Sequence, residues 1–225
     1  MSDIDFKPSE LKDILIDLVS RDLVPMVTSG PGLGKSAIAA QIAKECNLEL
    51  IDIRLSSCAP EDLMGLPMRM EKNGKMTAQF APFDMFPTED TPLPEGKEGF
   101  LLFLDEFNSA VRGVLAAAYK VVYDKMIGQH NLHPNTVIIL AGNREEDNAI
   151  VNDIGTALQS RVVHLEMRAD LDDFTAYAFK AGYDNRVMGF LEFQPHLLHA
   201  FDPEKVVNTF ACSRTWEFVS KFIKG

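Results

Sequence analysis

The sequence predicts an α/β fold in which a parallel sheet is flanked by helices and a small helical part follows. Two observations lead to this prediction. Short apolar strands alternate with helical segments, which is the order of a parallel sheet covered on both faces. Beyond residue 167 the strand pattern stops and only helical spacing continues. We therefore expect an α/β core over residues 1–167 and a helical part over residues 168–225.

The individual elements follow from the hydrophobic pattern. Ser9 is expected to cap a helix whose apolar residues within 11–19 recur at helical spacing. A second helix is expected from about residue 35 to residue 46, and a third carries apolar residues between Val111 and Val122. The expected strands cover residues 23–28, 48–55, 100–104, 136–141 and 162–167.

Two segments interrupt this alternation. Residues 66–80 contain the pair Asn73-Gly74 between two short runs, which is a strong hairpin signal. Residues 81–99 are rich in Pro, Asp, Glu and Gly and are expected to form a loop. Five of the ten methionines fall within residues 64–85. Flexible thioethers suit a surface that contacts a remodelled protein, but the same residues can pack the hairpin onto the core. Both interpretations stay open.

Composition limits the class of protein. Lys and Arg total 22 against 33 Asp and Glu, so the net charge is −11. Phosphate backbones repel such a chain unless it has a basic stripe, and we find none, so no nucleic-acid partner is expected. The longest apolar runs are about five residues, whereas a membrane helix needs roughly 20, so no membrane association is expected. Three cysteines without paired spacing predict neither disulfides nor zinc, and a cytoplasmic location is expected.

The strongest motif is the loop Ser29-Gly30-Pro31-Gly32-Leu33-Gly34-Lys35-Ser36, between an expected strand and an expected helix. Glycines let backbone N–H groups close around phosphate oxygens, and the helix N-terminus adds donors and partial positive charge. Lys35 would reach the β- and γ-phosphates, and the Ser36 hydroxyl would bind Mg²⁺. Ser29 stands where the usual motif has glycine, which is tolerable if its φ is negative.

An acidic pair ends the apolar strand that follows. Asp105 and Glu106 lie 70 residues after Lys35, at the carboxyl end of residues 100–104, where ligands of parallel sheets gather. Asp105 would hold Mg²⁺ through water. Glu106 would polarise the water that attacks the γ-phosphate, a role typically worth about 10²- to 10⁴-fold in rate. The alternative is a solvated acidic turn.

Two further residues are candidates for phosphate chemistry. Asn143 ends the next apolar strand, and its carboxamide can donate to the γ-phosphate and accept from the attacking water. Arg161 enters the last strand, at the far side of the sheet, where it can hardly serve its own nucleotide. It could act in trans on a neighbouring subunit as an arginine finger. The alternatives are a turn residue for Asn143 and a surface salt bridge for Arg161.

With these motifs in place, the chain resembles an AAA+ ATPase of the MoxR type, a group that includes CbbQ-like rubisco-activating ATPases. The resemblance covers nearly the whole chain. It rests on residues 30–36 as Walker A, residues 101–106 as Walker B, Asn143 as sensor 1 and Arg161 as the finger. Further matching stretches are residues 59–67, 105–110, 141–144 and 213–217.

The resemblance implies an ATP-hydrolysing, Mg²⁺-dependent protein with chaperone-like activity. Relatives form homo-oligomeric rings, usually hexamers, and remodel a protein partner that often carries a von Willebrand factor A domain. Arg214 matches sensor 2, a lid arginine that touches the γ-phosphate of its own subunit. Residues 66–80 match the helix 2 insert and residues 126–134 the pre-sensor hairpin, which both project toward the ring's pore. About a dozen residues follow Arg214, so a short or truncated lid is expected.

Other classes of function are weighed against this one. A non-hydrolysing ATP-dependent switch or scaffold stays open. A GTPase would need an Asn-Lys-x-Asp motif, which is absent. A small-molecule kinase would not need Arg161 to act across an interface, and the net charge disfavours a DNA motor. His196 and His199 have a spacing that could hold a metal, but without a nearby third ligand they are expected to be ordinary lid histidines.

Overall fold

A six-stranded parallel sheet forms the centre of the molecule. The computed structural model describes residues 5–144, 147, 159–205 and 208–224. The strands lie in the order β1-β10-β2-β9-β6-β3, and each neighbouring pair is parallel. This confirms the predicted fold class. The ends of the five predicted strands differ from the observed ends by at most two residues, whereas β1 has no counterpart in the prediction. The strands are β1 (Asp5–Phe6), β2 (Pro25–Ser29), β3 (Leu48–Arg54), β6 (Gly99–Asp105), β9 (Thr136–Asn143) and β10 (Val163–Met167).

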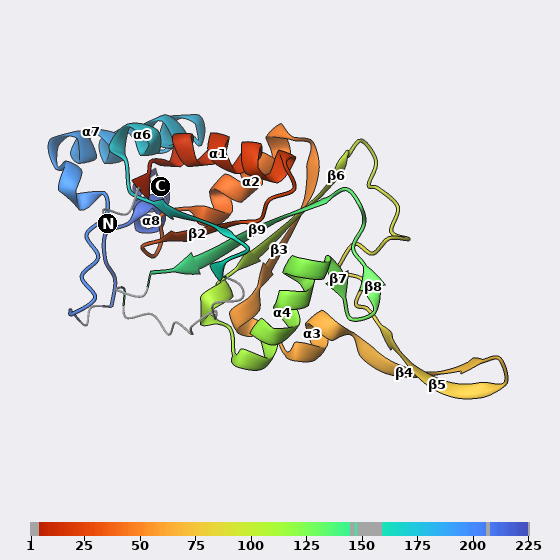
Figure 1. Ribbon diagram of the computed structural model, residues 1–225. Coiled ribbons are helices and arrows are strands. Elements are labelled where there is room, and N and C mark those ends of the chain that lie inside the picture. The colour runs from red at the N-terminus through yellow and green to blue at the C-terminus, as the bar shows by residue number, and fades with distance from the viewer. Residues whose placement is uncertain (1–4, 145–146, 148–158, 206–207, 225) are drawn as a thin grey trace.

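Helices cover both faces of this sheet (Figure 1). Helices α1 (Pro8–Ser20) and α2 (Lys35–Glu45) pack on one face, and α3 (Pro60–Met64) and α4 (Arg112–Asp124) lie on the other. Strand β6 is buried at every position. Because its side chains alternate between the faces, it contributes to both apolar cores. Leu101 and Phe103 join the cluster under α1 and α2, whereas Leu102 and Leu104 join the cluster under α4.

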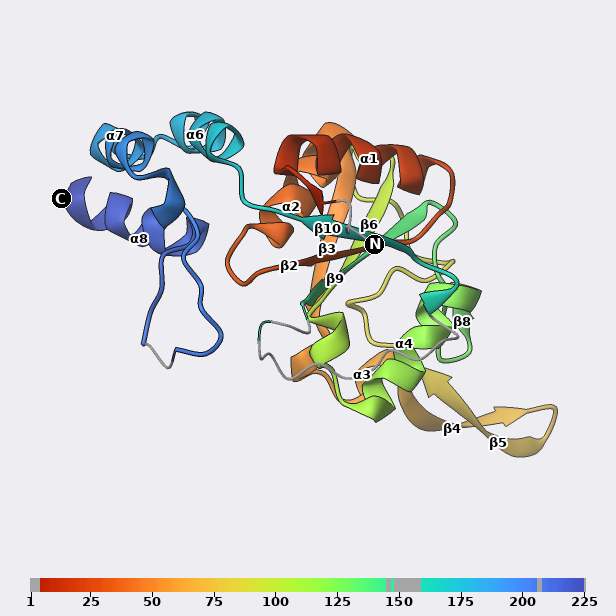
Figure 2. The same cartoon turned by 60° about the vertical axis from the view of Figure 1, so that its left-hand side comes forward.

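Helices follow β10 in the described residues. They are α6 (Leu171–Lys180), α7 (Asn185–Phe193) and α8 (Ser213–Lys224). Figure 2 shows these helices grouped at one side of the sheet, close to the loop between β2 and α2. They bury a small apolar cluster of their own, made of Phe174, Ala178, Val187, Met188, Leu191 and Leu198. We refer to residues 168–224 as the lid, and the division at residue 168 stays a prediction. None of the helices in the described ranges has the length and apolarity that crossing a bilayer requires.

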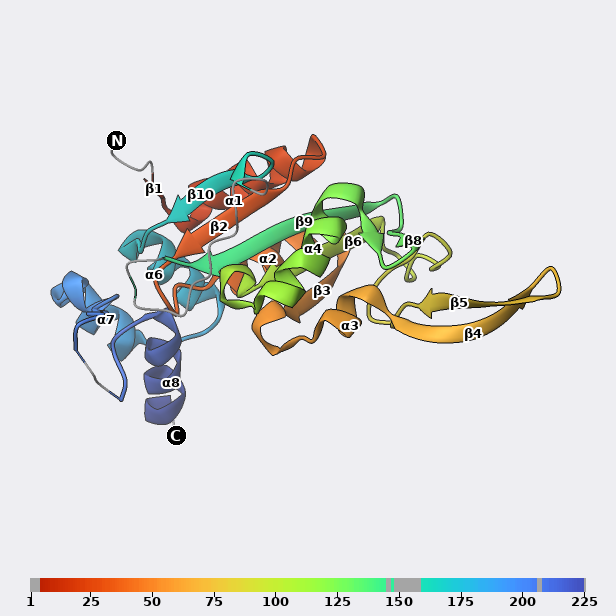
Figure 3. The ribbon, with the colours of Figure 1, turned by 60° about the horizontal axis from the view of Figure 1, so that its bottom comes forward.

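Two antiparallel hairpins extend from the α3–α4 side. Strands β4 (Leu66–Lys72) and β5 (Lys75–Ala81) form the long hairpin, which Figure 3 shows reaching well beyond the body of the protein. Asn73 and Gly74 both have positive φ, 55° and 71°, as a two-residue turn of this kind requires. Strands β7 (Met126–Ile127) and β8 (His130–Asn131) form the short hairpin.

The methionines of the long hairpin do not pack onto the core. Met68, Met70 and Met76 are 54%, 49% and 68% exposed. The packing interpretation of this segment is therefore wrong for these three side chains. The loop of residues 81–99 does contribute to the core, because Phe86 is 2% exposed and joins the cluster under α4.

Two helix starts differ from the prediction. Helix α1 begins at Pro8 with Lys7 as its N-cap, so Ser9 is not the cap. Proline suits the first helical position because its ring fixes a helical φ and no N–H is wasted there. The Ser9 N–H instead donates to Asp173 Oδ2 of the lid at 2.7 Å. Val111 precedes α4 as its N-cap and is exposed, so it lies outside the apolar stripe. Short 3₁₀ turns occur at Leu55–Ser57, Phe107–Ser109 and Pro195–Leu197.

Candidate functional site

The glycine loop between β2 and α2 needs glycine at two of its positions. Gly32 and Gly34 have φ values of +76° and +95°, a region that L-residues with a Cβ rarely adopt. Gly34 is also the N-cap of α2, so the loop leads directly into the N-terminus of that helix. Successive backbone N–H groups in such a turn, together with the helix end, form a concave site for an anion. Phosphate is the anion that this arrangement suits best.

Ser29 contributes a hydroxyl to this loop. It is fully buried, and it is not among the residues with positive φ, as its tolerance at a glycine position requires. Lys35 Nζ donates to Ser29 Oγ at 3.0 Å. Burial lowers the pKa of Lys35 below its ordinary 10.5, while the charge of Asp105 opposes part of this shift. The ammonium is held in place by the loop, and a negatively charged group bound beside it would offset the cost of its burial.

Oxygen ligands suited to a divalent cation lie next to the loop. Ser36 Oγ, in the first turn of α2, is 3.3 Å from Asp105 Oδ2 at the end of β6. Asp105 is only 9% exposed, and its other oxygen accepts the backbone N–H of Glu106 at 2.8 Å. Hydroxyl and carboxylate oxygens are what Mg²⁺ prefers, and Mg²⁺ usually takes one or two protein ligands besides phosphates and water. The residues present fit Mg²⁺ bound together with a phosphate ligand.

Glu106 has an unusual backbone. Its φ and ψ are 53° and 36°, which is left-handed and costly for a residue with a Cβ. Its carboxylate accepts a hydrogen bond from Ser56 Oγ, in the 3₁₀ turn that follows β3. The backbone therefore leaves the strand direction at Glu106, and its carboxylate stays at the edge of the sheet. No local sequence signal identifies Ser56, because its partner lies 50 residues away.

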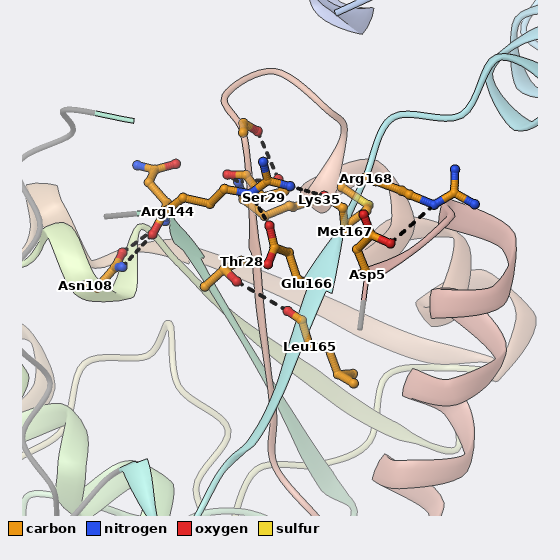
Figure 4. Close-up of polar contacts among 12 residues, drawn as sticks. Asp5, Thr28, Ser29, Lys35, Asn108, Arg144, Leu165, Glu166, Met167 and Arg168 are labelled. Carbon is orange, nitrogen blue, oxygen red and sulfur yellow. Dashed lines mark hydrogen bonds and ion pairs between the residues drawn. The ribbon is translucent and has the colours of Figure 1, made fainter. Parts of the chain in front are cut away.

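Asn143 at the end of β9 is held by a buried side chain. Asn108 Oδ1 accepts the Asn143 N–H at 3.0 Å, and Asn108 Nδ2 donates to the Asn143 carbonyl at 2.7 Å (Figure 4). Gly142 leaves room for this pair, since a Cβ there would lie 2.6 Å from Asn108 Oδ1. Asn108 therefore fixes the backbone at the point where β9 ends, and sequence reasoning assigned it no role.

Arg144 continues this edge toward β10. Its Nε lies 2.5 Å from Glu166 Oε1, and its Nη2 donates to the Met167 carbonyl at 3.2 Å (Figure 4). The guanidinium thus joins β9 to β10 across β2, which lies between them. The charge of Arg144 also acts to lower the pKa of Lys35 in the loop.

The lid contacts the outer side of the glycine loop. His199 Nε2 lies 3.1 Å from the Pro31 carbonyl, and the Arg214 N–H donates to the Gly32 carbonyl at 3.4 Å. A Cβ at Gly32 would lie 2.5 Å from Cys212 Sγ, so the lid fills the space that a larger residue would need. Burial lowers the pKa of His199, which favours the neutral ring. His199 therefore packs against the glycine loop, a contact that has no signal in the local sequence.

These elements enclose one cavity of about 330 Å³. Its floor is the glycine loop and the start of α2, and its far wall is the lid. Each motif predicted as Walker A, Walker B, sensor 1 or sensor 2 contributes to it, together with two lid tyrosines, but Gly30 of the predicted phosphate-binding residues does not line it. Its lining includes Pro31, Gly32, Leu33, Gly34, Lys35, Ser36, Asp105, Glu106, Asn143, Tyr177, Tyr183 and Arg214.

Arg161 lies elsewhere. Strands β10 and β2 are parallel, with Val163 opposite Pro25 and Met167 opposite Ser29. Arg161 precedes Val163, so it lies at the end of the sheet opposite the glycine loop. A strand rises about 3.3 Å per residue, so β10 alone separates the two ends by about 13 Å. This subunit's own Arg161 is therefore not part of its cavity.

A family model decides what this arrangement is. The model for the ATPase family associated with various cellular activities (AAA) matches residues 26–166. The chain belongs to the AAA family of ATPases. The matched segment runs from β2 into β10 and includes the glycine loop, the acidic pair, Asn143 and Arg161. Membership in the AAA family implies nucleotide binding.

Solved structures of similar fold agree with the AAA assignment. A proposed ATPase from Cytophaga hutchinsonii has a TM-score of 0.54 at 15% identity, covering 96% of this chain and 58% of that one. NtrX from Brucella abortus has a TM-score of 0.53 at 16% identity, covering 95% of this chain and 48% of NtrX. NtrX in complex with ADP has a TM-score of 0.51 at 16% identity, covering 93% of this chain and 47% of NtrX. The chain thus spans about half the length of these proteins, and at such identities the likeness concerns the fold. No curated protein matches the sequence.

Nucleotide affinity should depend on pH through Lys35. In the free protein burial lowers the pKa of Lys35, whereas bound phosphates would raise it. Binding therefore takes up a proton at pH values between the two pKa values, and affinity falls as pH rises through the lower one. We expect the Kd for a fluorescent ADP analogue to increase as the pH rises toward the ordinary lysine pKa of 10.5. Lys35→Met should bind weakly throughout and lose this decline, and an affinity of the unchanged protein that is flat over this range would contradict the prediction.

Replacing Asn108 should destabilise the edge of the sheet. Asn108→Ala leaves the partly buried N–H and carbonyl of Asn143 without their side-chain partner, which is expected to cost about 1–3 kcal/mol. Asn108→Asp keeps the acceptor for the Asn143 N–H but sets a buried carboxylate oxygen against the Asn143 carbonyl, so it should be destabilised at least as much as Asn108→Ala. The free energy of unfolding in urea measures both. A stability of Asn108→Ala within about 0.3 kcal/mol of the unchanged protein would show that the pair contributes nothing.

Proposed function

We propose that the chain is an ATP-hydrolysing AAA protein of the MoxR type that works as a ring, usually of six subunits in such proteins. In this proposal it uses Mg²⁺ and ATP to remodel a protein partner, and the partner carries a von Willebrand factor A domain. The observation that carries the proposal is the distance between the cavity and Arg161 within one subunit. The cavity gathers every predicted catalytic group except Arg161, which lies at the opposite end of β10.

The groups around the cavity suit phosphoryl transfer to water. The loop N–H groups and Lys35 would bind the β- and γ-phosphates, and Ser36 and Asp105 would hold Mg²⁺. The cation would neutralise charge on the phosphates when bound. Glu106 would accept a proton from the attacking water. The oxygen of that water would bond to the γ-phosphorus while the bond from this phosphorus to the β–γ bridging oxygen breaks, so that ADP leaves. Asn143 would orient that water.

Two arginines would complete the site from different subunits. Arg214 is the second residue of α8 and lines the cavity of its own subunit, which supports its role as sensor 2. Arg161 would reach the γ-phosphate of the adjacent subunit and stabilise the charge that develops there. A single isolated subunit would then hydrolyse ATP slowly, and assembly would switch on turnover.

The long hairpin supports a protein as the partner. On β4, residues Leu66, Met68 and Met70 point to the same face of the hairpin and are about half exposed. Exposed methionines are adaptable, so they can contact varied or moving surfaces. The net charge of −11 disfavours a nucleic-acid partner in the same position.

Mixed assemblies test whether Arg161 acts in trans. Arg161→Ala alone should lower turnover about 10³-fold, because the finger is missing from every interface. Lys35→Ala alone should not bind nucleotide. In an equal random mixture about one quarter of the interfaces join an intact cavity to an intact finger. ATP turnover should therefore recover to a substantial fraction of the normal rate, and the normal rate per subunit should rise with protein concentration.

Glu106→Gln is the matched control for this mixture. It should bind ATP without hydrolysing it, and mixing it with Lys35→Ala should restore nothing, because neither kind of subunit offers a competent cavity. If Arg161→Ala keeps the full rate, or if its mixture with Lys35→Ala stays inactive, the trans arrangement is wrong. If the unchanged protein turns over no faster than Glu106→Gln, a non-hydrolysing switch or scaffold is supported instead.

The hairpin methionines should be needed for partner binding and not for folding. Replacing Met68, Met70 and Met76 together by Ser should weaken binding to a purified von Willebrand factor A domain protein at least about tenfold in biolayer interferometry. Because these side chains are exposed, the melting temperature should stay within about 2 °C. Met26→Ser, at a buried methionine, should lower the melting temperature by several degrees. No binding by the unchanged protein would reject this partner, and undiminished binding by the triple variant would reject the surface.

A further inference from the structure

The predicted finger is stacked on an aromatic ring of its own subunit. The guanidinium carbon of Arg161 lies 4.3 Å from the centre of the Tyr123 ring. A cation at this distance over a ring face is attracted by the negative charge density of that face. Arginine has a long, flexible side chain, so this contact restricts a group that would otherwise sample many rotamers.

The ring itself is held firmly. Tyr123 lies in the last turn of α4 and is partly buried against the apolar cluster under that helix. Its neighbours Val121 and Val122 belong to the same cluster. Val162, directly after Arg161, is 8% exposed and belongs to it too. The backbones that carry Tyr123 and Arg161 are therefore both anchored in one apolar core, which keeps the ring and the guanidinium close together.

Stacking is compatible with binding a phosphate. The guanidinium carbon lies over the ring, and the five N–H donors point outward from that carbon in the guanidinium plane. The same side chain can therefore rest on Tyr123 and still direct donors toward phosphate oxygens of another subunit. A finger fixed in advance loses less conformational freedom when it reaches the transition state, so its stabilisation appears in kcat.

We propose that Tyr123 is a positioning residue that holds Arg161 over its ring, ready to act on the nucleotide of the adjacent subunit. This inference rests on the proposed trans role of Arg161. Tyr123 would contact neither ATP nor water, so its effect would pass entirely through the arginine. It would therefore alter turnover in the cavity of the neighbour and leave nucleotide binding in its own cavity intact.

Substitution of the ring tests the proposal. Tyr123→Leu should lower kcat about two- to tenfold at saturating ATP and change KM by less than about twofold. Tyr123→Phe keeps the aromatic face and should restore most of the rate. Val122→Ala is the packing control, because Val122 precedes Tyr123 on α4 and is buried in the same cluster. It should lose stability as Tyr123→Leu does and keep kcat.

A series of fluorinated rings at position 123 separates the effect of the ring on turnover from any effect on folding. Phenylalanine with one, two or three ring fluorines at position 123 keeps nearly the same shape while the negative charge of the ring face falls. The rate should decrease stepwise with fluorine content, with Arg161 unchanged. In an Arg161→Ala background the series should have no effect. A flat series, or the same decline in the Arg161→Ala background, would overturn the proposal.

Mixed assemblies separate this inference from the function on which it rests. Tyr123→Leu mixed with Lys35→Ala should regain turnover at the interfaces where Lys35→Ala supplies a well-held finger. Loss of activity by Arg161→Ala together with full activity of Tyr123→Leu would reject the positioning role alone. Full activity of Arg161→Ala would reject the trans finger, and the positioning role with it.

Discussion

Three parallel strands end at one edge of the sheet, and the hydrogen bonds between them fix how far each strand runs before it ends. Ser29 of β2 pairs with Asn143 of β9, and β6 pairs with β9 on its other side. The glycine loop follows β2 and the acidic pair ends β6, so register alone brings loop, carboxylates and amide together. A slip of one residue would turn each side chain of the strand to the opposite face and take Asp105 away from Ser36. The candidate site therefore depends on the buried packing of β6 and β9 that holds this register.

The glycine loop meets a second constraint from the outside. Its left-handed φ values serve the inner, anion-binding side, whereas His199 and Cys212 of the lid occupy the space on the outer side. The two lid residues are held together, because Ala200 bridges Ala211 and the rings of Phe201 and Phe210 lie 4.7 Å apart. A phosphate that draws the loop inward would thus pull on the lid. The contact offers a direct physical link between nucleotide binding and the position of α6, α7 and α8.

Much of the fold and part of the site could be predicted, because the signals are local. Strands buried on both faces are continuous apolar runs. The phosphate loop and the Asn73-Gly74 turn are short motifs that need positive φ values, which glycine and asparagine adopt most readily. Ser56, Asn108 and His199 could not be predicted, since each acts on a backbone or carboxylate that is distant in sequence. The start of α1 was misplaced because Ser9 matched a cap preference that Pro8, with its fixed φ, overrides.

Helix α4 joins the opposite end of the sheet to the hairpins. Its Lys120 donates to the Gly128 carbonyl in the turn of the short hairpin, and His130 of that hairpin bonds the Phe80 carbonyl of β5 at 2.9 Å. The ring of Tyr123 under the predicted finger therefore belongs to the same packed body as the surface proposed for the partner. Contact alone does not couple them, because coupling needs two positions of α4 that partner and nucleotide favour differently. If the partner favours one of them, then by reciprocity ATP in the adjacent subunit must change the affinity for the partner by the same factor.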